Sequence, residues 1–77
     1  MKPTYMILAQ AEGHQAEIRY TANTRGEIEK TFARLLSTRK RMQGKGLTVT
    51  KERDGYFECV WVSDWATWTV QYWICKA

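Results

Sequence analysis

Four tryptophans, Trp61, Trp65, Trp68 and Trp73, fall within thirteen residues near the end of the chain. Indole is the largest apolar side chain, and it can fill a pocket of a partner protein or stack on a base. A chain of 77 residues has only one small core in which to bury such rings. The concentration of indoles therefore indicates either a binding surface or a core that is filled from both faces of a sheet.

Cationic side chains are concentrated in one segment. The net charge is +4, and residues 30–45 hold six lysines and arginines but no carboxylate. Several of these side chains are spaced three or four residues apart, so on a helix they lie along one side. We interpret this row as a surface for phosphates or for an acidic protein, although an ordinary solvated helix face is also polar. The row comprises Lys30, Arg34, Ser37 and Arg41, extended at its C-terminal end by Lys40 and Lys45.

Groups that could perform catalysis are few and scattered. The one histidine, His14, stands in a predicted turn, with no nucleophile or carboxylate placed to work with it. Cys59 and Cys75 fall in strand-like segments, where burial raises the pKa of a thiol, and no C-x-x-C pair supplies metal ligands. Residues 44–46 (GKG) follow a predicted helix, so they are not a phosphate-binding loop. We therefore expect a non-enzymatic protein with no catalytic residue, no cofactor and no metal.

The cellular location follows from composition. The sequence has no run of about 18 apolar residues, so we expect no membrane span. Two cysteines are far fewer than a secreted disulfide scaffold would carry. We expect a soluble, cytoplasmic protein that does not bind membranes.

One helix is needed to hold the cationic row, and the sequence predicts it between Thr24 and Gly44. Thr24 followed three residues later by Glu27 fits a capping box, which marks the first turn of a helix. Gly44 and Gly46 end the helix, and cations occupy its last turns, where the helix dipole favours them. Apolar groups at helical spacing predict the buried side, which comprises Ile28, Phe32, Leu35, Leu36, the Arg39 stem and Met42.

Alternating patterns predict five strands around this helix. Gly13 turns the first hairpin, and Asp54-Gly55 is a strong signal for a second one. The element order ββαβββ predicts an α+β fold, with one antiparallel sheet and a single amphipathic helix packed on one face. We expect a single domain over residues 1–77. The predicted strands are residues 5–11, 16–22, 47–52, 56–62 and 69–76.

The Asp54-Gly55 turn also predicts which residues pair. It places Arg53 opposite Tyr56, Lys51 opposite Glu58, Val49 opposite Val60, and Leu47 opposite Val62. A five-residue connection to the last strand then pairs Val62 with Val70 and Val60 with Tyr72. The residues predicted to face the helix are Val49, Val60, Val62, Val70, Tyr72 and Ile74. On residues 16–22, Ile18 and Tyr20 are expected to share one face.

The predicted pairing leaves aromatic rings on the other face of the sheet. One helix cannot cover both faces, so Phe57, Trp61 and Trp73 are expected to form an uncovered patch for a protein or for unstacked bases. A curled sheet or a second copy of the chain would bury the same rings instead. Trp65 and Trp68 are expected at a loop tip, where a partner contact and local packing are equally consistent with the sequence.

Three functions fit these surfaces. The first is a small effector that docks on a larger, nucleic-acid-handling protein or nucleoprotein assembly with an acidic surface. In format the chain is similar to many small phage and mobile-element proteins that interfere with host machinery, including anti-CRISPR inhibitors. The second is direct binding of DNA or RNA through the phosphate backbone. The third is a homodimer formed through the sheet face.

We favour the first function for two reasons. Cations outside the helix alternate with acids, as at residues 51–53, so the sheet offers no continuous track for phosphates. The tryptophans, which dominate protein interfaces, are also predicted to lie away from the basic helix. In the second function Lys30, Arg34, Arg41 and Lys45 would contact the phosphates.

Overall fold

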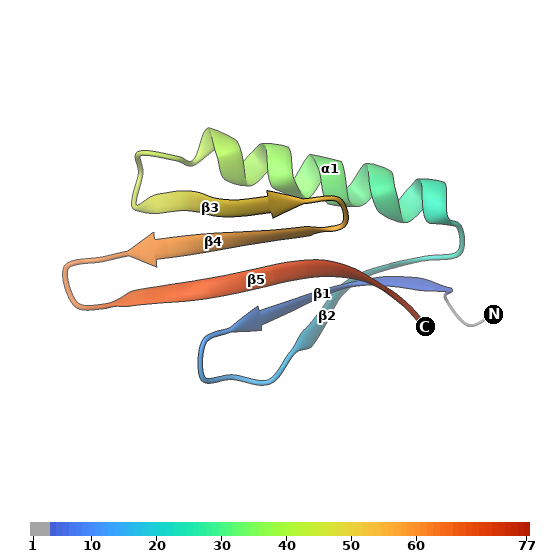
Figure 1. Cartoon of the computed structure of the whole chain (residues 1–77), viewed down its shortest axis with the longest axis horizontal. Coiled ribbons are helices and arrows are strands. Elements are labelled where there is room, and N and C mark those ends of the chain that lie inside the picture. The colour runs from blue at the N-terminus through green and yellow to red at the C-terminus, as the bar shows by residue number, and fades with distance from the viewer. Residues whose placement is uncertain (1–3) are drawn as a thin grey trace.

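The computed structural model describes residues 4–77, and it contains five strands and one helix (Figure 1). The predicted α+β fold and the ββαβββ order are confirmed. The last strand begins two residues earlier than predicted. The elements are β1 (Tyr5–Ala11), β2 (Glu17–Ala22), α1 (Arg25–Arg41), β3 (Leu47–Arg53), β4 (Tyr56–Val62) and β5 (Thr67–Lys76).

The five strands form one antiparallel sheet in the order β2-β1-β5-β4-β3. The last strand, β5, lies at the centre because it pairs with β1 on one side and β4 on the other. The helix connects β2, at one edge of the sheet, to β3, at the opposite edge. It therefore packs across one face, which we call the covered face, and leaves the other face open.

The helix begins and ends as the sequence predicts. The Thr24 hydroxyl accepts a hydrogen bond from the Glu27 N–H at 3.2 Å, which satisfies one donor of the first turn. At the other end the Met42 N–H donates to the Arg39 carbonyl at 3.0 Å. Ile28 is among the residues that α1 buries against the sheet, so the predicted apolar side is the side that packs.

Within residues 4–77, no helix is long and apolar enough to cross a membrane.

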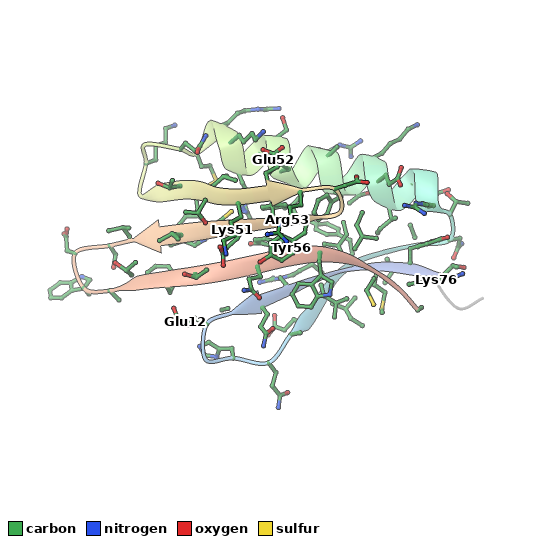
Figure 2. All side chains as sticks on the ribbon, in the orientation of Figure 1. Glu12, Lys51, Glu52, Arg53, Tyr56 and Lys76 are labelled. Carbon is green, nitrogen blue, oxygen red and sulfur yellow. The ribbon has the colours of Figure 1, made fainter. Side chains whose placement is uncertain are left out.

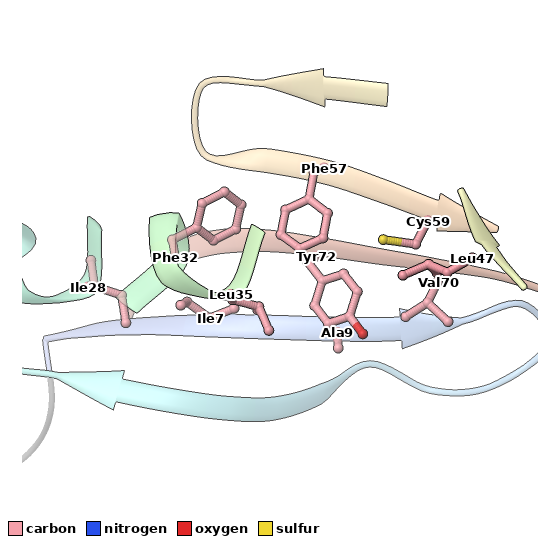
Figure 3. Packing of buried hydrophobic residues seen from close by; sticks show 10 residues of the cluster. All are labelled: Ile7, Ala9, Ile28, Phe32, Leu35, Leu47, Phe57, Cys59, Val70 and Tyr72. Carbon is pink, nitrogen blue, oxygen red and sulfur yellow. The ribbon is translucent and has the colours of Figure 1, made fainter. Parts of the chain in front are cut away.

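The core is centred on three aromatic rings between α1 and the sheet (Figure 3). The Phe57 ring stacks on Tyr72 with ring centroids 4.7 Å apart, and it meets the edge of Phe32 at 5.2 Å. Aromatic pairs of this geometry stabilise a core beyond the area that they remove from water. The buried residues are Ile7, Ala9, Ile28, Phe32, Leu35, Leu47, Phe57, Cys59, Val70 and Tyr72.

A β-bulge changes the predicted register between β3 and β4. Next to the turn, Arg53 pairs with Tyr56 and Lys51 with Glu58, as predicted. Beyond Thr50 the register shifts, so Val49 pairs with Cys59 and Leu47 with Trp61. The predicted Val49–Val60 and Leu47–Val62 pairs are therefore wrong. Because side chains alternate between faces, the one-residue shift brings Leu47 onto the covered face.

The predicted faces of β4 are also wrong. Residues 63–66 connect β4 to β5, and this shorter turn pairs Phe57 with Tyr72 and Trp61 with Trp68. The predicted pairing of Val62 with Val70 and of Val60 with Tyr72 is therefore wrong. Phe57, Cys59 and Trp61 consequently lie on the covered face, whereas Val60 and Val62 lie on the open face. Burying a phenyl ring and a thiol removes more apolar surface from water than burying two valines, which favours this arrangement.

A second bulge separates two side chains of β2 that were predicted to share a face. Ile7 of β1 pairs with Tyr20, but its neighbour Leu8 pairs with Ile18. Tyr20 therefore points to the covered face and Ile18 to the open face. Ile18 is 58% exposed there, because β2 is an edge strand and only β1 flanks it.

The two thiols differ in burial, and this predicts a difference in reactivity. Burial raises the pKa of the Cys59 thiol from 9.0 to about 11. At pH 8 the native Cys59 should thus carry about 100-fold less thiolate than it does in the unfolded chain, and react correspondingly more slowly. We expect an aromatic disulfide reagent to modify one thiol per native chain, Cys75, and two in urea. Rapid modification of a native Cys75→Ser variant would contradict this.

The molecule is elongated, with principal extents of 44 × 25 × 17 Å. The turn between β4 and β5 forms one end of it, and the start of β1 and the end of β5 lie toward the other (Figure 1). There the Ala77 N–H donates a hydrogen bond to the Thr4 carbonyl at 2.7 Å.

Candidate partner-binding surface

The outward side of α1 carries cations that are not paired with a carboxylate of the described chain. Lys30, Arg34 and Arg41 are exposed, and so is Lys45 in the loop that follows the helix. None of these four residues forms an ion pair with any residue of the described chain, 4–77. We call these four residues the outer cations.

Two further cations of residues 30–45, one from the predicted row and one from the predicted apolar side, have other environments. The Lys40 ammonium lies 2.8 Å from a Glu52 carboxylate oxygen, so β3 compensates this charge. Arg39 points toward the sheet, in line with its predicted place on the apolar side. Fewer cations of the helix are therefore unpaired than the sequence suggests. These unpaired cations lie on the side of α1 that is directed away from the sheet.

Arg39 makes contacts that its sequence position does not reveal. Its guanidinium carbon lies 5.6 Å from the centre of the Tyr72 ring and 5.9 Å from that of the Trp61 ring. Nη2 donates to the Tyr72 hydroxyl at 3.4 Å, and Nη1 to the Met42 sulfur at 3.9 Å. The buried Nε has no acceptor, and no carboxylate of residues 4–77 lies within ion-pair distance of this group. The sequence signal that indicates a cation packed against aromatic rings is an arginine on the apolar side of a predicted helix.

The turn between β4 and β5 presents three of the four tryptophans. Trp61 and Trp68 are cross-strand neighbours whose rings stack, with centroids 6.3 Å apart and planes at 11°. Trp68 is 38% exposed, and Trp65 at the turn is 94% exposed. Because the Ser63 hydroxyl accepts hydrogen bonds from the Trp65 and Ala66 N–H groups, the turn is fixed although the Trp65 ring is free. We call the side chains of Trp61, Trp65 and Trp68 the indole end.

The indole end adjoins the C-terminal end of the helix. Arg39 of α1 lies over the Trp61 ring, and the Val62 N–H donates to the Gly46 carbonyl at 2.7 Å. Lys45, which precedes this glycine, is therefore at the same end of the molecule. The basic and aromatic residues were predicted to lie apart, but the structure brings part of each group together.

The open face of the sheet is a smaller aromatic surface than predicted. Trp73 is half-buried on this face, as expected, between Leu8 and Tyr56 of the neighbouring strands. Phe57 is 0% exposed and packs under the helix, so it cannot contact a partner. Trp61 also lies on the covered face, where it is half-buried. The predicted patch of three uncovered rings is wrong, and only Trp73 of the three remains on the open face.

A polar row crosses the middle of the open face, and its charges compensate each other. The Lys51 ammonium lies 3.8 Å from a Glu58 carboxylate oxygen, and Gln71 donates to the other oxygen at 3.5 Å. Lys51 and Tyr56, which project from neighbouring strands, are labelled in Figure 2. This face therefore offers no row of unpaired cations.

The residues considered for catalysis remain separate in the structure. His14 is exposed in the β1–β2 turn, and Cys59 is buried in the core. Across residues 4–77, no group of three or more histidine, cysteine or acidic side chains could hold a metal ion. No protein-family model, no curated protein and no solved structure matches the chain.

Proposed function

We propose that this protein is a small non-enzymatic effector that docks on an acidic surface of a larger, nucleic-acid-handling protein assembly. The outer cations are the observation that carries the proposal. Lys30, Arg34 and Arg41 span roughly 16 Å of helix on its outward side. Positive charge arranged in this way accelerates association with an acidic surface and orients the two partners.

The concentration of unpaired charge on one surface supports docking over mere solubility. Elsewhere in the described chain, Arg25 lies 2.8 Å from Glu29, Lys40 is paired with Glu52, and Lys51 lies near Glu58. A surface that serves only solubility mixes both signs of charge, as these elements do. The outward side of α1 departs from that pattern between Lys30 and Arg41.

Trp65 would add a buried contact to this electrostatic one. Tryptophan is the residue type most enriched among interface positions that dominate binding energy. The Ser63 hydrogen bonds hold the turn in place, so little backbone freedom would be lost when the ring enters a partner's pocket. Docking through the helix and this turn would use adjoining surfaces, because the C-terminal end of α1 lies next to the indole end.

The charges around Trp65 favour a protein as the docking partner of this surface. Asp64 is exposed beside Trp65 and forms no ion pair within residues 4–77, so it would repel a phosphate chain laid directly over the Trp65 ring. A protein surface can place a cation opposite Asp64 and acids opposite the outer cations. Direct binding of nucleic acid along α1 is the competing function, and the experiment below separates the two.

Reversing two of the outer cations is expected to abolish docking. The Arg34→Glu, Arg41→Glu variant places two acids on the outward side of α1, where neither residue packs against the sheet, so the fold should be retained. The measurement is affinity capture from nuclease-treated host lysate, followed by titration of the identified partner. We expect at least about a 30-fold loss of affinity, because charge reversal turns attraction into repulsion at two contacts.

The matched control makes the same change in net charge on other elements. Arg19→Glu with Arg53→Glu alters exposed residues of β2 and β3, and it should leave capture intact. Equal capture by the folded Arg34→Glu, Arg41→Glu variant would refute docking through the helix. Loss of capture by the unaltered protein on nuclease treatment would show instead that nucleic acid is the direct partner.

A further inference from the structure

We infer that the indole end also holds a binding site for single-stranded nucleic acid, formed by Trp61, Trp68 and Arg39. The stacked indoles supply the first part of this site. Trp68 lies on the stretch of β5 beyond β1, because the last β1 residue, Ala11, pairs with Val70. Within residues 4–77, no strand pairs with Trp68 on the side away from Trp61, so an unpaired base can extend the stack there.

Arg39 supplies the second part, a cation with unused donors. A guanidinium carries five N–H groups, and here its acceptors among residues 4–77 are one tyrosine hydroxyl at 3.4 Å and one thioether at 3.9 Å. Both are weak partners for a full positive charge at a half-buried position. A phosphate oxygen is the acceptor that guanidinium binds most strongly, and the rings of Trp61 and Tyr72 already fix the orientation of this group.

The surroundings of the pair favour a nucleic acid strand over an isolated anion. Lys45 lies at the same end, in the loop whose Gly46 carbonyl binds the Val62 N–H, so a second phosphate has a cation within the same surface. Stacking requires a base whose face is free, which a single strand offers and an intact duplex does not. The site therefore discriminates by strand state and not by sequence. Lys45 is the one outer cation that adjoins this site, whereas Trp61, Trp68 and Arg39 are not outer cations. Variants of Trp68 and Arg39 therefore test the site separately from the Arg34 and Arg41 variant that tests docking.

The test is binding of a fluorescent oligothymidylate to the full chain at low salt, followed by anisotropy. Trp68→Ala should weaken binding roughly 5- to 150-fold, since one base–aromatic stack contributes roughly 1–3 kcal/mol. Arg39→Met should weaken binding and also lower the slope of log affinity against log salt by about 0.7, the value for one lost phosphate contact on a single strand. Trp73→Ala, which changes an indole on the open face, is the control and should bind normally.

Two further readouts keep the inference open to refutation. Arg39→Met should retain the fold, because methionine can replace the apolar stem of the arginine and removes a buried donor that has no acceptor. A duplex of the same length should bind at least about tenfold more weakly than the single strand. Absence of oligothymidylate binding, equal binding of duplex and single strand, or normal binding by the folded Trp68→Ala or Arg39→Met variants would each overturn the site. Loss of partner capture with intact oligothymidylate binding would overturn docking alone.

Discussion

Replacing Phe57 with alanine is expected to lower the free energy of unfolding by about 3–5 kcal/mol. The ring is 0% exposed and lies between Phe32 and Tyr72 at the centre of the core. A single core in a chain of this size supplies about 3–5 kcal/mol of net stability, so most Phe57→Ala molecules should be unfolded.

Urea denaturation followed by circular dichroism measures this effect. Tyr56→Ala is the matched control, because Tyr56 precedes Phe57 on β4 but lies half-buried on the open face. We expect this control to lower the unfolding free energy by only about 1 kcal/mol. Equal losses for the two variants would contradict the assignment of Phe57 to the covered face, on which the description of the core depends.

Replacing Gly46 with alanine is expected to have the second largest effect, a loss of about 1–3 kcal/mol in unfolding free energy. Gly46 has φ of +87°, a conformation that alanine adopts only with strain. Its added methyl carbon would lie 3.0 Å from the backbone oxygen of Val62, which is held by the β4 ladder and cannot move away easily. The variant should therefore loosen the junction between the α1–β3 loop and the indole end.

Two other glycines separate the causes of this effect. Gly44 has the same φ of +87° but no atom within 4 Å of an added methyl carbon, so Gly44→Ala should show the cost of backbone strain alone. Gly26 lies in α1 with no atom within 4 Å, and Gly26→Ala should raise stability by about 0.5–1 kcal/mol. The same urea titration applies to all three variants. A Gly46→Ala loss no larger than that of Gly44→Ala would show that the contact with Val62 is unimportant.

Local signals were sufficient to predict the helix and the Asp54-Gly55 turn. The Thr24 cap, the apolar spacing from Ile28 onward and the Asp54-Gly55 turn each involve residues close in sequence, and each is confirmed. The pairing of β3 with β4 next to this turn was also predicted correctly, because the paired residues are close in sequence. The fold class then depended only on the order of these elements.

The faces of β4 could not be assigned from alternation, because both faces of this strand carry apolar groups. Phe57, Cys59 and Trp61 alternate with Val60 and Val62, so either set satisfies the pattern of a half-buried strand. The size of Phe57 and its partner Tyr72 decides the outcome, and that pairing depends on the length of the next turn. An error of one residue in a turn or a bulge moves every side chain to the opposite face.

The candidate surface was predictable to the extent that it depends on one element. The spacing of Lys30, Arg34 and Arg41 is a property of the helix alone, and their exposure follows from it. The pairing of Lys40 with Glu52 is a tertiary contact with β3, which spacing cannot reveal. The adjacency of Arg39 and Trp61 likewise depends on the pairing of β4 with β5, which places Trp61 on the covered face.

The hydrogen bond between Ala77 and Thr4 has a practical consequence for attaching the molecule to a surface. The Trp65 turn lies at the other extremity of the 44 Å long axis (Figure 1). A tether at residue 77 would therefore project the tryptophans outward from a biosensor chip or a bead. Coupling through lysines would instead consume Lys30 and Lys45, so tethered and lysine-coupled protein should differ in the fraction that captures a partner.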